Sequence, residues 1–258
     1  MRFLISISLY VLCLGMNAQS FQGKAIYLFN NSYAQVDWGK KKMSDAEVSM
    51  WKSKLSEGSR KTYQLNFTLQ ESSWAKVESL AVGGGGKGGD KAGWDDSQEN
   101  LLYKNLANQS YKVETEAFDK LFLVNGDLEL PAWEITGETK TIGDYQVQKA
   151  IYTREKQTMA FGKEEPVMEK EIVEAWFTTQ IPISSGPDYY WGLPGLILEI
   201  KNGNISYTCE RVELNSSGDF SIEIPKKGQK VTAEELDKIV EEKTEEMYKR
   251  FNKSGKKG

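Results

Sequence analysis

The sequence predicts a mainly β protein built on one antiparallel sheet, with a helix inserted near its N-terminal end and another at its C-terminal end. Short runs in which apolar and polar residues alternate recur along the chain, as in half-buried antiparallel strands. Two sequences typical of hairpin turns, Asn125-Gly126 and Asn202-Gly203-Asn204, follow such runs. Two capping-box sequences, each followed by apolar residues at helical spacing, indicate the two helices.

The first strand is expected over residues 23–30. A capping box at 44–47 then begins a helix near Ser44–Glu57, whose apolar face carries Val48, Trp51 and Leu55. Further strands are expected over 61–70, 74–81, 101–106, 109–114, 120–124, 145–151, 172–178, 196–201 and 205–214. Asn125-Gly126 is expected to reverse the chain after the strand over 120–124. The alternating Phe220, Ile222 and Ile224 are expected to close the sheet.

Residues 82–98 interrupt this pattern with a dense run of glycines. Strand patterns of the same kind lie on both sides, so we expect a flexible insertion within a single domain over 19–258. A phosphate-binding loop is not expected, because Gly88 follows Lys87 where a serine or threonine would hold magnesium.

The C-terminal amphipathic helix is expected over residues 231–254. The capping box Thr232-Ala233-Glu234-Glu235 precedes an apolar stripe formed by Leu236, Ile239, Val240, Met247 and Phe251. We expect this stripe to pack on the chain's own sheet, while a partner protein remains an alternative occupant.

Residues 1–18 are typical of a signal peptide. Arg2 supplies the positive start, an apolar run follows, and Ala18 is a small residue at a plausible cleavage point. The run is too short to span a membrane, and no second one follows. We therefore expect an exported protein that does not span a membrane.

The composition excludes several classes of chemistry. The 258 residues include no histidine, two cysteines, 33 Lys+Arg and 37 Asp+Glu. Histidine-based triads and histidine-ligated metals are therefore excluded, and two cysteines cannot form a four-cysteine metal site. We expect no cofactor and no metal, and the net charge of −4 argues against a nucleic-acid partner. Cys209, the cysteine outside the signal peptide, has apolar neighbours that favour burial.

The most distinctive segment covers residues 186–197. Three consecutive aromatic residues, Tyr189, Tyr190 and Trp191, cannot all face one side of a strand, so some lie exposed or in a loop. Pro194 and Gly195 suit the centre of a type II turn, and Gly192 allows close approach of another backbone. The candidate binding residues are Tyr190, Trp191, Gly192, Leu193, Pro194 and Gly195. The competing interpretation is that they only lock a corner of the sheet.

Gly192-Leu193-Pro194-Gly195-Leu196-Ile197 resembles the signature of the GLPGLI family of exported proteins of Gram-negative bacteria. The resemblance implies a location in the periplasm or at the cell surface of such a bacterium. Further blocks that resemble this family are Trp133-Glu134-Ile135, Glu138-Thr139-Lys140, Lys149-Ala150, Ala175-Trp176-Phe177-Thr178 and Ile181-Pro182. The family is mostly of unknown function and is similar to the bowl-like N-terminal domain of some peptide-N-glycosidases. The resemblance therefore implies a single curved sheet, bowl-like or half-barrel in shape, and carries over no catalytic residue. Members often have a cysteine where this chain has Val147, so a disulfide from that position to Cys209 is not available here.

The leading functional hypothesis is a non-enzymatic exported module that binds an unknown small ligand or a protein of the outer membrane or envelope. A concave sheet with exposed aromatic residues is a common form of binding site. The alternative is a carboxylate-based hydrolase acting on glycans or peptides, with Glu134 and Glu138 beside Trp133 as the acid pair. A third hypothesis is a scaffold whose C-terminal helix docks on a membrane complex.

Overall fold

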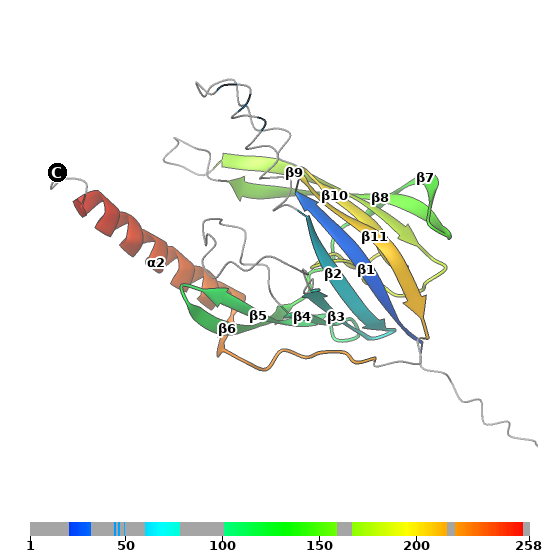
Figure 1. The fold of residues 1–258 in the computed structure, drawn as a ribbon, viewed down its shortest axis with the longest axis horizontal. Coiled ribbons are helices and arrows are strands. Elements are labelled where there is room, and N and C mark those ends of the chain that lie inside the picture. Colours follow the sequence, from blue (N-terminus) through cyan, green and yellow to red (C-terminus); the bar gives the residue numbers. More distant parts are fainter. Residues whose placement is uncertain are drawn as a thin grey trace, which may run out of the picture.

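The computed structural model describes residues 21–31, 60–77, 101–158, 167–215 and 220–254, together with the single positions 44, 46 and 49. The strands are β1 (Gln22–Asn31), β2 (Arg60–Thr68), β3 (Glu71–Lys76), β4 (Leu101–Asn105), β5 (Ser110–Ala117), β6 (Lys120–Asp127), β7 (Glu134–Ile142), β8 (Tyr145–Thr158), β9 (Val167–Thr178), β10 (Leu196–Asn202), β11 (Ile205–Leu214) and β12 (Gln229–Thr232). One helix, α2 (Ala233–Ser254), follows β12 (Figure 1).

Three predicted features lie outside these residues. They are the signal peptide over 1–18, the glycine-rich insertion over 82–98 and the N-terminal helix near Ser44–Glu57, of which only the three single positions are described. Among the described elements, α2 is the single helix, and no described helix is long and apolar enough to cross a membrane.

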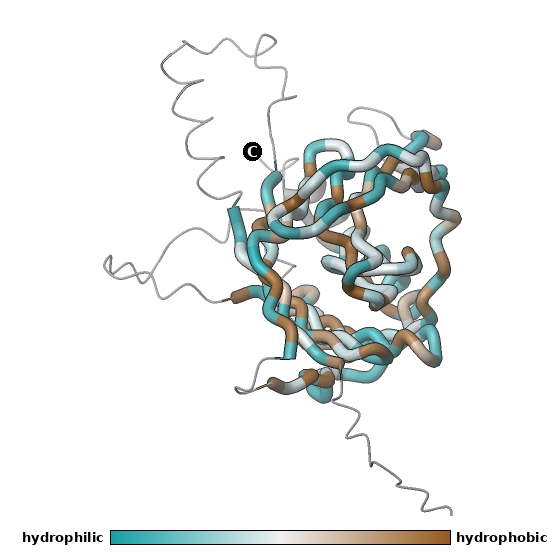
Figure 2. Tube along the Cα trace, turned by 90° about the vertical axis from the view of Figure 1, so that its right-hand side faces the viewer, coloured by the Kyte–Doolittle hydropathy of each residue, from teal (hydrophilic) through white to brown (hydrophobic). Residues whose placement is uncertain are grey.

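The strands form one open sheet in the order β12-β6-β5-β4-β3-β2-β1-β11-β10-β9-β8-β7. Sequential hairpins build two halves, β1 to β6 and β7 to β11, which the pairing of β1 with β11 joins in the middle of the sheet. Each half is antiparallel, which accounts for the short alternating runs in the sequence. Figure 2 shows the sheet curving around an interior in which further chain lies, in line with the curved shape that the family resemblance implies.

The prediction of a wholly antiparallel sheet is wrong at one edge, because β12 pairs with β6 in parallel. Residues 220–224 were expected to close the sheet, but they form no strand. They lie across side chains instead: Asn66 donates to the carbonyl of Ser221 over 3.0 Å, and the Glu223 amide donates to Ser73 over 3.3 Å. This long connection carries the chain across to the β6 edge of the sheet. Because it is not a tight hairpin, it allows β12 to pair with β6 in parallel.

The turn expected at Asn125-Gly126 is also wrong, because both residues lie inside β6. The chain reverses earlier, at Phe118 and Asp119, which have φ angles of 51° and 58°, the left-handed values that tight hairpin turns need. Gly126 serves another purpose, because a Cβ atom there would lie 2.6 Å from the ring of Tyr111. The glycine thus makes room for an aromatic ring on the neighbouring strand.

Two other local predictions are confirmed. The turn at Asn202-Gly203-Asn204 joins β10 to β11, with Asn202 opposite Ile205 and Gly203 at a φ of 54°. The C-terminal capping box forms reciprocal hydrogen bonds between Thr232 and Glu235, at 2.8 and 3.2 Å. Both patterns are fixed by residues close in sequence, which is why sequence alone reveals them.

The helix α2 begins two residues later than the predicted boundary, because Val231 and Thr232 belong to β12. Its first turns bury part of the predicted stripe, since Leu236 and Ile239 pack against the core. Farther along, Met247 is 59% exposed, and Figure 1 shows the helix extending away from the sheet.

The inner face of the sheet centre carries a cluster of aromatic side chains. Tyr63 stacks on Trp74 with ring centroids 4.9 Å apart, and Tyr27 and Tyr207 meet the Trp74 ring edge-on at 5.3 and 5.7 Å. These rings come from β1, β2, β3 and β11, so they join the two halves through a buried apolar core.

The connection between β9 and β10, residues 179–195, packs against this inner face, and we call it the inner loop. Tyr27 on β1 donates to the carbonyl of Ile197 over 2.7 Å, and the hydroxyls of Ser72 and Ser185 lie 3.0 Å apart. The amides of Leu196 and Ile197 donate to the carbonyls of Ile181 and Ser185, both over 3.0 Å. The loop is thereby bonded to the start of β10 and to β3 of the other half, and β1 bonds to β10 just beyond it.

The two glycines of the hexapeptide have roles opposite to those predicted. Gly192 adopts a left-handed φ of 94°, whereas Gly195 is not among the residues with positive φ, so the type II turn expected at Pro194-Gly195 is wrong. Gly195 is needed for close approach instead, because a Cβ atom there would lie 2.1 Å from the carbonyl oxygen of Thr178.

Replacing Gly195 with alanine should therefore destabilise the protein by more than about 3 kcal/mol, since the clash is with backbone that cannot move aside. Gly203→Ala is the matched control, because that site has a φ of 54° but open space around the Cβ position. The control should cost only about 1 kcal/mol, for the left-handed backbone. Urea denaturation measures both variants, and equal losses would contradict the packing argument.

Candidate functional site

A buried lysine holds the inner loop from beneath. Lys104 on β4 is 0% exposed, and its Nζ donates to the carbonyls of Gly186, Asp188 and Tyr190 over 2.8, 2.6 and 3.4 Å. An ammonium group has three hydrogens to donate, so these three carbonyls match its capacity. Because the acceptors are alternate residues of one segment, a single side chain fixes the path of the loop over 186–190.

Charge reinforces this contact. Burial lowers the pKa of Lys104 to about 7, while the nearby Asp188 carboxylate acts in the opposite direction. Burial likewise raises the pKa of Asp188, against which the Lys104 charge and a 3.4 Å hydrogen bond from Tyr207 favour the carboxylate. Asp188 has a φ of 50°, a left-handed value that aspartate tolerates better than most residues. The two groups act on each other electrostatically: the Lys104 charge favours the Asp188 carboxylate, and that carboxylate favours the protonated lysine.

Two tryptophans tie the loop to the connection between β6 and β7. The indole Nε1 of Trp133 donates to the Trp191 carbonyl over 2.8 Å, and the indole of Trp191 donates to the Glu129 carbonyl over 2.9 Å. Trp191 is buried, and its amide neighbour Gly192 donates to the hydroxyl of Ser184 over 3.1 Å. These bonds fix the outer side of the loop as firmly as Lys104 fixes the inner side.

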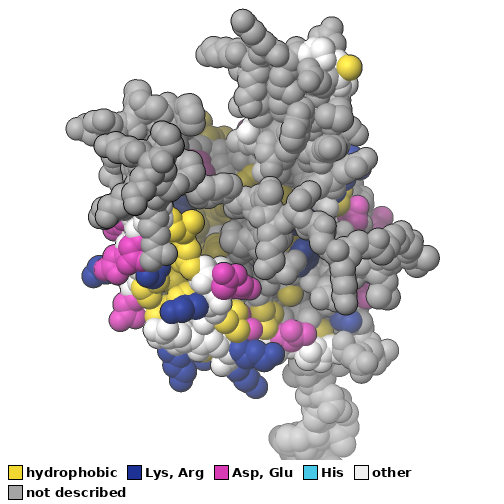
Figure 3. Space-filling view, turned by 60° about the vertical axis from the view of Figure 1, so that its left-hand side comes forward, with side chains coloured by type: hydrophobic (Ala, Val, Ile, Leu, Met, Phe, Trp, Pro, Cys, Tyr) yellow, Lys and Arg dark blue, Asp and Glu magenta, His cyan; other side chains and the backbone are white. Residues whose placement is uncertain are grey.

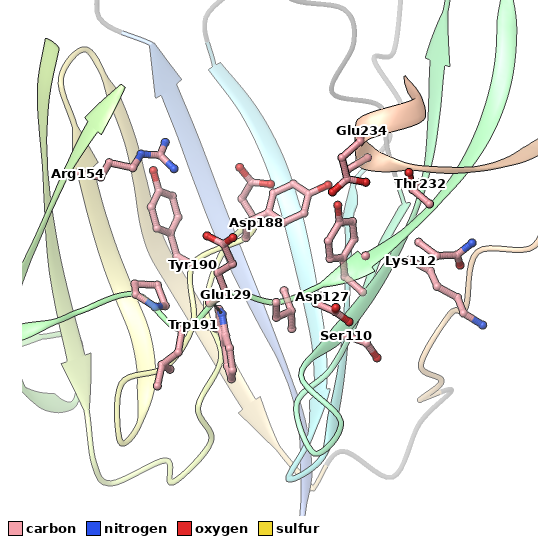
Figure 4. A pocket seen from close by; sticks show the side chains of 18 of the residues that line it. Ser110, Lys112, Asp127, Glu129, Arg154, Asp188, Tyr190, Trp191, Thr232 and Glu234 are labelled. Atoms are coloured by element: carbon pink, nitrogen blue, oxygen red, sulfur yellow. Dashed lines mark hydrogen bonds between the residues drawn. The ribbon is translucent and has the colours of Figure 1, made fainter. Parts of the chain in front are cut away.

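Between the inner loop and the strands of the first half lies a pocket of about 940 Å³. Its lining comes from β5, β6, the β6–β7 connection, β8, the inner loop and the start of α2, as Figure 4 shows. The lining residues that carry aromatic or charged side chains are Tyr111, Lys112, Asp127, Glu129, Tyr152, Arg154, Asp188, Tyr189, Tyr190, Trp191 and Glu234. The volume lies within the range of small-molecule sites. The lining is more polar than is usual for them, because about half of its residues carry polar or charged side chains.

A hydrogen-bond network occupies one end of the pocket. The Arg154 guanidinium on β8 pairs with Glu171 on β9 through its Nε. Asn202 donates to the other oxygen of Glu171 over 2.9 Å and to the hydroxyl of Tyr190 over 3.1 Å. Desolvation is the main reason that the pKa of Tyr190 rises to about 12. The phenol therefore stays protonated at neutral pH.

Acidic side chains gather at the other end, around Tyr111. Burial is the largest cause of the raised pKa of Tyr111, and the charges of Glu234, Asp237 and Asp127 add to it. The ring of Tyr189 meets that of Tyr111 edge-on at 5.3 Å and is 44% exposed. An accessible aromatic ring beside three carboxylates is well suited to attract a positive charge.

The structure divides the predicted binding residues into two groups. Tyr190 and Trp191 line the pocket, whereas Gly192, Leu193, Pro194 and Gly195 do not. Leu193 is in the core and Gly195 packs on Thr178, so both stabilise the loop, and Pro194 is exposed. The hexapeptide thus builds the corner, and the aromatic residues before it face the pocket.

The acid pair considered for a hydrolase lies elsewhere. Glu134 and Glu138 are exposed on β7, the edge strand at the end of the sheet, and neither lines the pocket. Glu138 pairs with Lys149 at 3.4 Å. The pocket carboxylates are instead Asp127, Glu129, Asp188 and Glu234, which come from segments that no sequence motif links.

Sequence reasoning overlooked Lys104 and Arg154. The signal for Lys104 was present, because Leu102 and Lys104 share a face of a short, largely apolar strand, and a lysine there needs buried acceptors. Arg154 gave no such signal, because its role depends on pairing with β9 and on the position of the inner loop.

Cys209 is buried and free, and burial raises the pKa of its thiol to about 12. That environment agrees with the burial expected from its apolar neighbours. Within the described part of the chain, no group of three or more acidic or cysteine side chains is arranged to hold a metal ion. Figure 3 shows side chains of both charge signs interspersed with apolar ones on one face, rather than a basic patch.

Comparison with known proteins finds a similar fold and identifies no function. The model of a family described as a protein of unknown function, Porph_ging, matches residues 133–199, which include the inner loop. No curated protein matches the chain. The GLPGLI family identity itself stays a prediction.

Two solved structures of PNGF-II are similar in fold. For the C2 crystal form the TM-score is 0.50 at 12% sequence identity, over 86% of this chain and 33% of that chain. For the P21 form the TM-score is 0.47 at 13% identity, over 85% and 33%. This chain therefore spans about a third of the length of PNGF-II, and at such identity the similarity concerns the fold alone.

Lys104→Met should destabilise the protein by about 3–5 kcal/mol, because it leaves three buried carbonyls and the Asp188 carboxylate without their partner. Lys230→Met, at an exposed lysine of β12, is the control and should cost less than about 0.5 kcal/mol. Thermal and urea denaturation measure both. A small loss for Lys104→Met would show that the loop is held without the ammonium group.

The lysine should also make stability depend on pH. Its pKa is about 7 in the folded protein, against a usual value of 10.5. Between these values the unfolded chain binds more protons at this position, so its contribution to the free energy of unfolding rises with pH. Wild type should gain stability relative to Lys104→Met from about pH 7 to about pH 9 in urea titrations. A difference that shrinks as pH rises would contradict the lowered pKa.

Proposed function

We propose that this chain is an exported, non-enzymatic binding module whose ligand occupies the pocket beside the inner loop. The observation that carries the proposal is the pocket of about 940 Å³, lined by Tyr111, Tyr152, Tyr189, Tyr190 and Trp191. Aromatic side chains offer large contact areas at little cost in conformational entropy, which suits recognition.

The rigidity of the inner loop supports a binding role. Lys104 fixes its path from one side, and the Trp133 and Trp191 indoles fix it from the other. A pocket wall that is already in place does not have to be ordered when the ligand arrives, so more of the contact energy remains for affinity. A loop that only filled the interior would not need to leave an open volume beside the exposed ring of Tyr189.

The proposed location is the periplasm or the cell surface, because residues 1–18 have the charge and hydropathy pattern of a signal peptide. The partners available there are small ligands and proteins of the envelope. The protein isolated from the envelope of its own host should begin at Gln19, which the intact mass reports directly.

A hydrolase acting on glycans or peptides is the second candidate, and one observation favours it: Asp127, Glu129 and Glu234 place carboxylates in the pocket. Acid–base hydrolysis needs such groups across a substrate. An enzyme would turn over glycan or peptide substrates and lose that turnover in Glu129→Gln while its fold survives. A binding module has no turnover to lose.

The binding proposal predicts a bound mass. Native mass spectrometry of the protein released gently from the envelope should show a discrete adduct, because the pocket forms before its ligand arrives. Tyr189→Ala should lose most of that adduct, since the Tyr189 ring is exposed in the pocket.

Phe118→Ala is the matched control, because Phe118 is a similarly exposed aromatic residue that does not line the pocket. The control should keep the adduct. An adduct that survives in both variants would place the ligand elsewhere on the protein, and a bare chain in every preparation would count against the binding module.

A further inference from the structure

We infer that the ligand of this pocket is a short peptide with free ends, bound with its carboxylate at the Arg154 end and its ammonium group at the Tyr111 end. The inference rests on the proposed function, since it names the ligand class of the same site. It follows from how charge is distributed over the pocket. Figure 4 shows Arg154 and Tyr190 on one side, Glu234 and Asp127 on the other, and Trp191 and Glu129 between them.

The Arg154 end is equipped to receive a carboxylate. A guanidinium group has five N–H donors in a planar fork, and the pairing of Arg154 with Glu171 is made through Nε. The side chain is 48% exposed where it borders the pocket. The four hydrogens on the two terminal nitrogens have the geometry that binds a carboxylate through two parallel bonds.

Tyr190 adds a neutral donor at the same end. Its hydroxyl oxygen accepts a hydrogen bond from Asn202 over 3.1 Å, which directs the hydroxyl hydrogen toward another acceptor. Glu171 meanwhile keeps a bond from Asn202 at 2.9 Å. The end therefore combines one cation with one phenolic donor, both held in place by the same asparagine and glutamate.

The opposite end is acidic. The charges of Glu234 and Asp237 from α2 and of Asp127 from β6 act on the Tyr111 phenol, and Asp127 and Glu234 line the pocket. The start of α2 does not attract an anionic group of the ligand, because the amides of Thr232 and Glu235 already donate to each other's side chains. The pKa of Glu234 is lowered chiefly by a hydrogen bond from its own amide, then by Thr232 and by the charge of Lys238 one turn along the helix. Lys112 is the single lysine among the residues that line the pocket.

Two further carboxylates line the pocket, Asp188 and Glu129, and Figure 4 shows Glu129 between the two ends. The Lys104 charge favours the Asp188 carboxylate. One end therefore presents the terminal N–H donors of Arg154, whose charge Glu171 balances, and the other presents the carboxylates of Asp127 and Glu234. Tyr189 lies beside the acidic end, where its exposed face can stack on an ammonium group.

A peptide satisfies both ends, whereas a ligand with one charge satisfies one. Its two termini carry opposite charges separated by about 3.3–3.6 Å per residue in extended form. The exposed Leu130 in the lining offers apolar contact to a peptide. The side chains of Ser110 and Asn125, opposite Asp127 and Lys112 on the paired strands, offer hydrogen bonds to its main chain.

Calorimetric titration with free-ended oligoalanines, from dipeptide to pentapeptide, tests the inference. One length should bind best, where its termini match the two ends. For that length, amidating the C-terminus or acetylating the N-terminus should each weaken binding about tenfold or more, because each removes a charge-assisted contact.

Two variants assign the ends. Arg154→Gln should weaken binding of the free peptide about tenfold or more and leave binding of the C-terminally amidated peptide unchanged. Glu234→Gln should weaken binding of the free peptide by a similar factor and leave binding of the N-terminally acetylated peptide unchanged. Arg211→Gln is the control for the first, since Arg211 also pairs with a glutamate through Nε, 3.0 Å from Glu213, outside the pocket. Glu242→Gln, exposed on the same helix, is the control for the second. Both controls should bind like wild type.

The outcomes separate this inference from the proposed function. If no oligoalanine binds while Tyr189→Ala still removes the adduct found in the envelope protein, the pocket binds a ligand of another class and the inference is wrong. If blocked and free peptides bind equally, or if both pocket variants bind like wild type, the end-to-end charge assignment is overturned. Circular dichroism and melting of each variant exclude loss of fold as the cause of weaker binding.

Discussion

The contact between the Lys104 ammonium group and three carbonyls of the inner loop is the constraint on which the rest of the structure depends. A charged group without solvent is tolerated only when its donors are satisfied, and the carbonyls of Gly186, Asp188 and Tyr190 do this. Those carbonyls need the lysine equally, because backbone acceptors turned into the interior otherwise lose the hydrogen bonds that water would supply. With a net stability of about 5–15 kcal/mol typical of a folded domain, neither partner is dispensable.

This contact also joins the two halves of the sheet. Lys104 belongs to the meander of β1 to β6, while the loop that it holds belongs to the meander of β7 to β11. The two meanders share one line of backbone pairing, between β1 and β11, and the inner loop adds a second connection through side chains. The pocket lies along this second connection and takes its lining from both halves. The interaction that stabilises the fold is thus the one that shapes the candidate site.

Predictions from sequence succeeded where neighbouring residues decide the structure and failed where distant ones do. Thr232 and Glu235 lie three positions apart and bond each other, so the helix start was predictable. Asn125-Gly126 has the composition of a hairpin turn, yet the ring of Tyr111 across the strand pair requires the glycine within β6. Residues 220–224 bond to Asn66 and Ser73 instead of forming a strand. The chain then reaches the β6 edge, where β12 pairs in parallel. For the site, consecutive aromatic residues revealed Tyr190 and Trp191, whereas Arg154 and Tyr111 acquire their positions from strand pairing.

The hexapeptide at 192–197 therefore marks an architecture rather than a specificity. Its glycines set a left-handed bend and a close backbone contact, and its apolar residues Leu193, Leu196 and Ile197 are buried. Side chains that line the candidate pocket come from β5, β6, β8 and α2, outside the motif. A chain that keeps the hexapeptide and a buried lysine beneath the loop retains the pocket wall, while substitutions at Arg154, Tyr111 or Glu234 change the charge that the pocket presents. At 12% identity the similarity to PNGF-II concerns the fold alone, so it carries no information about what the pocket of this chain could bind.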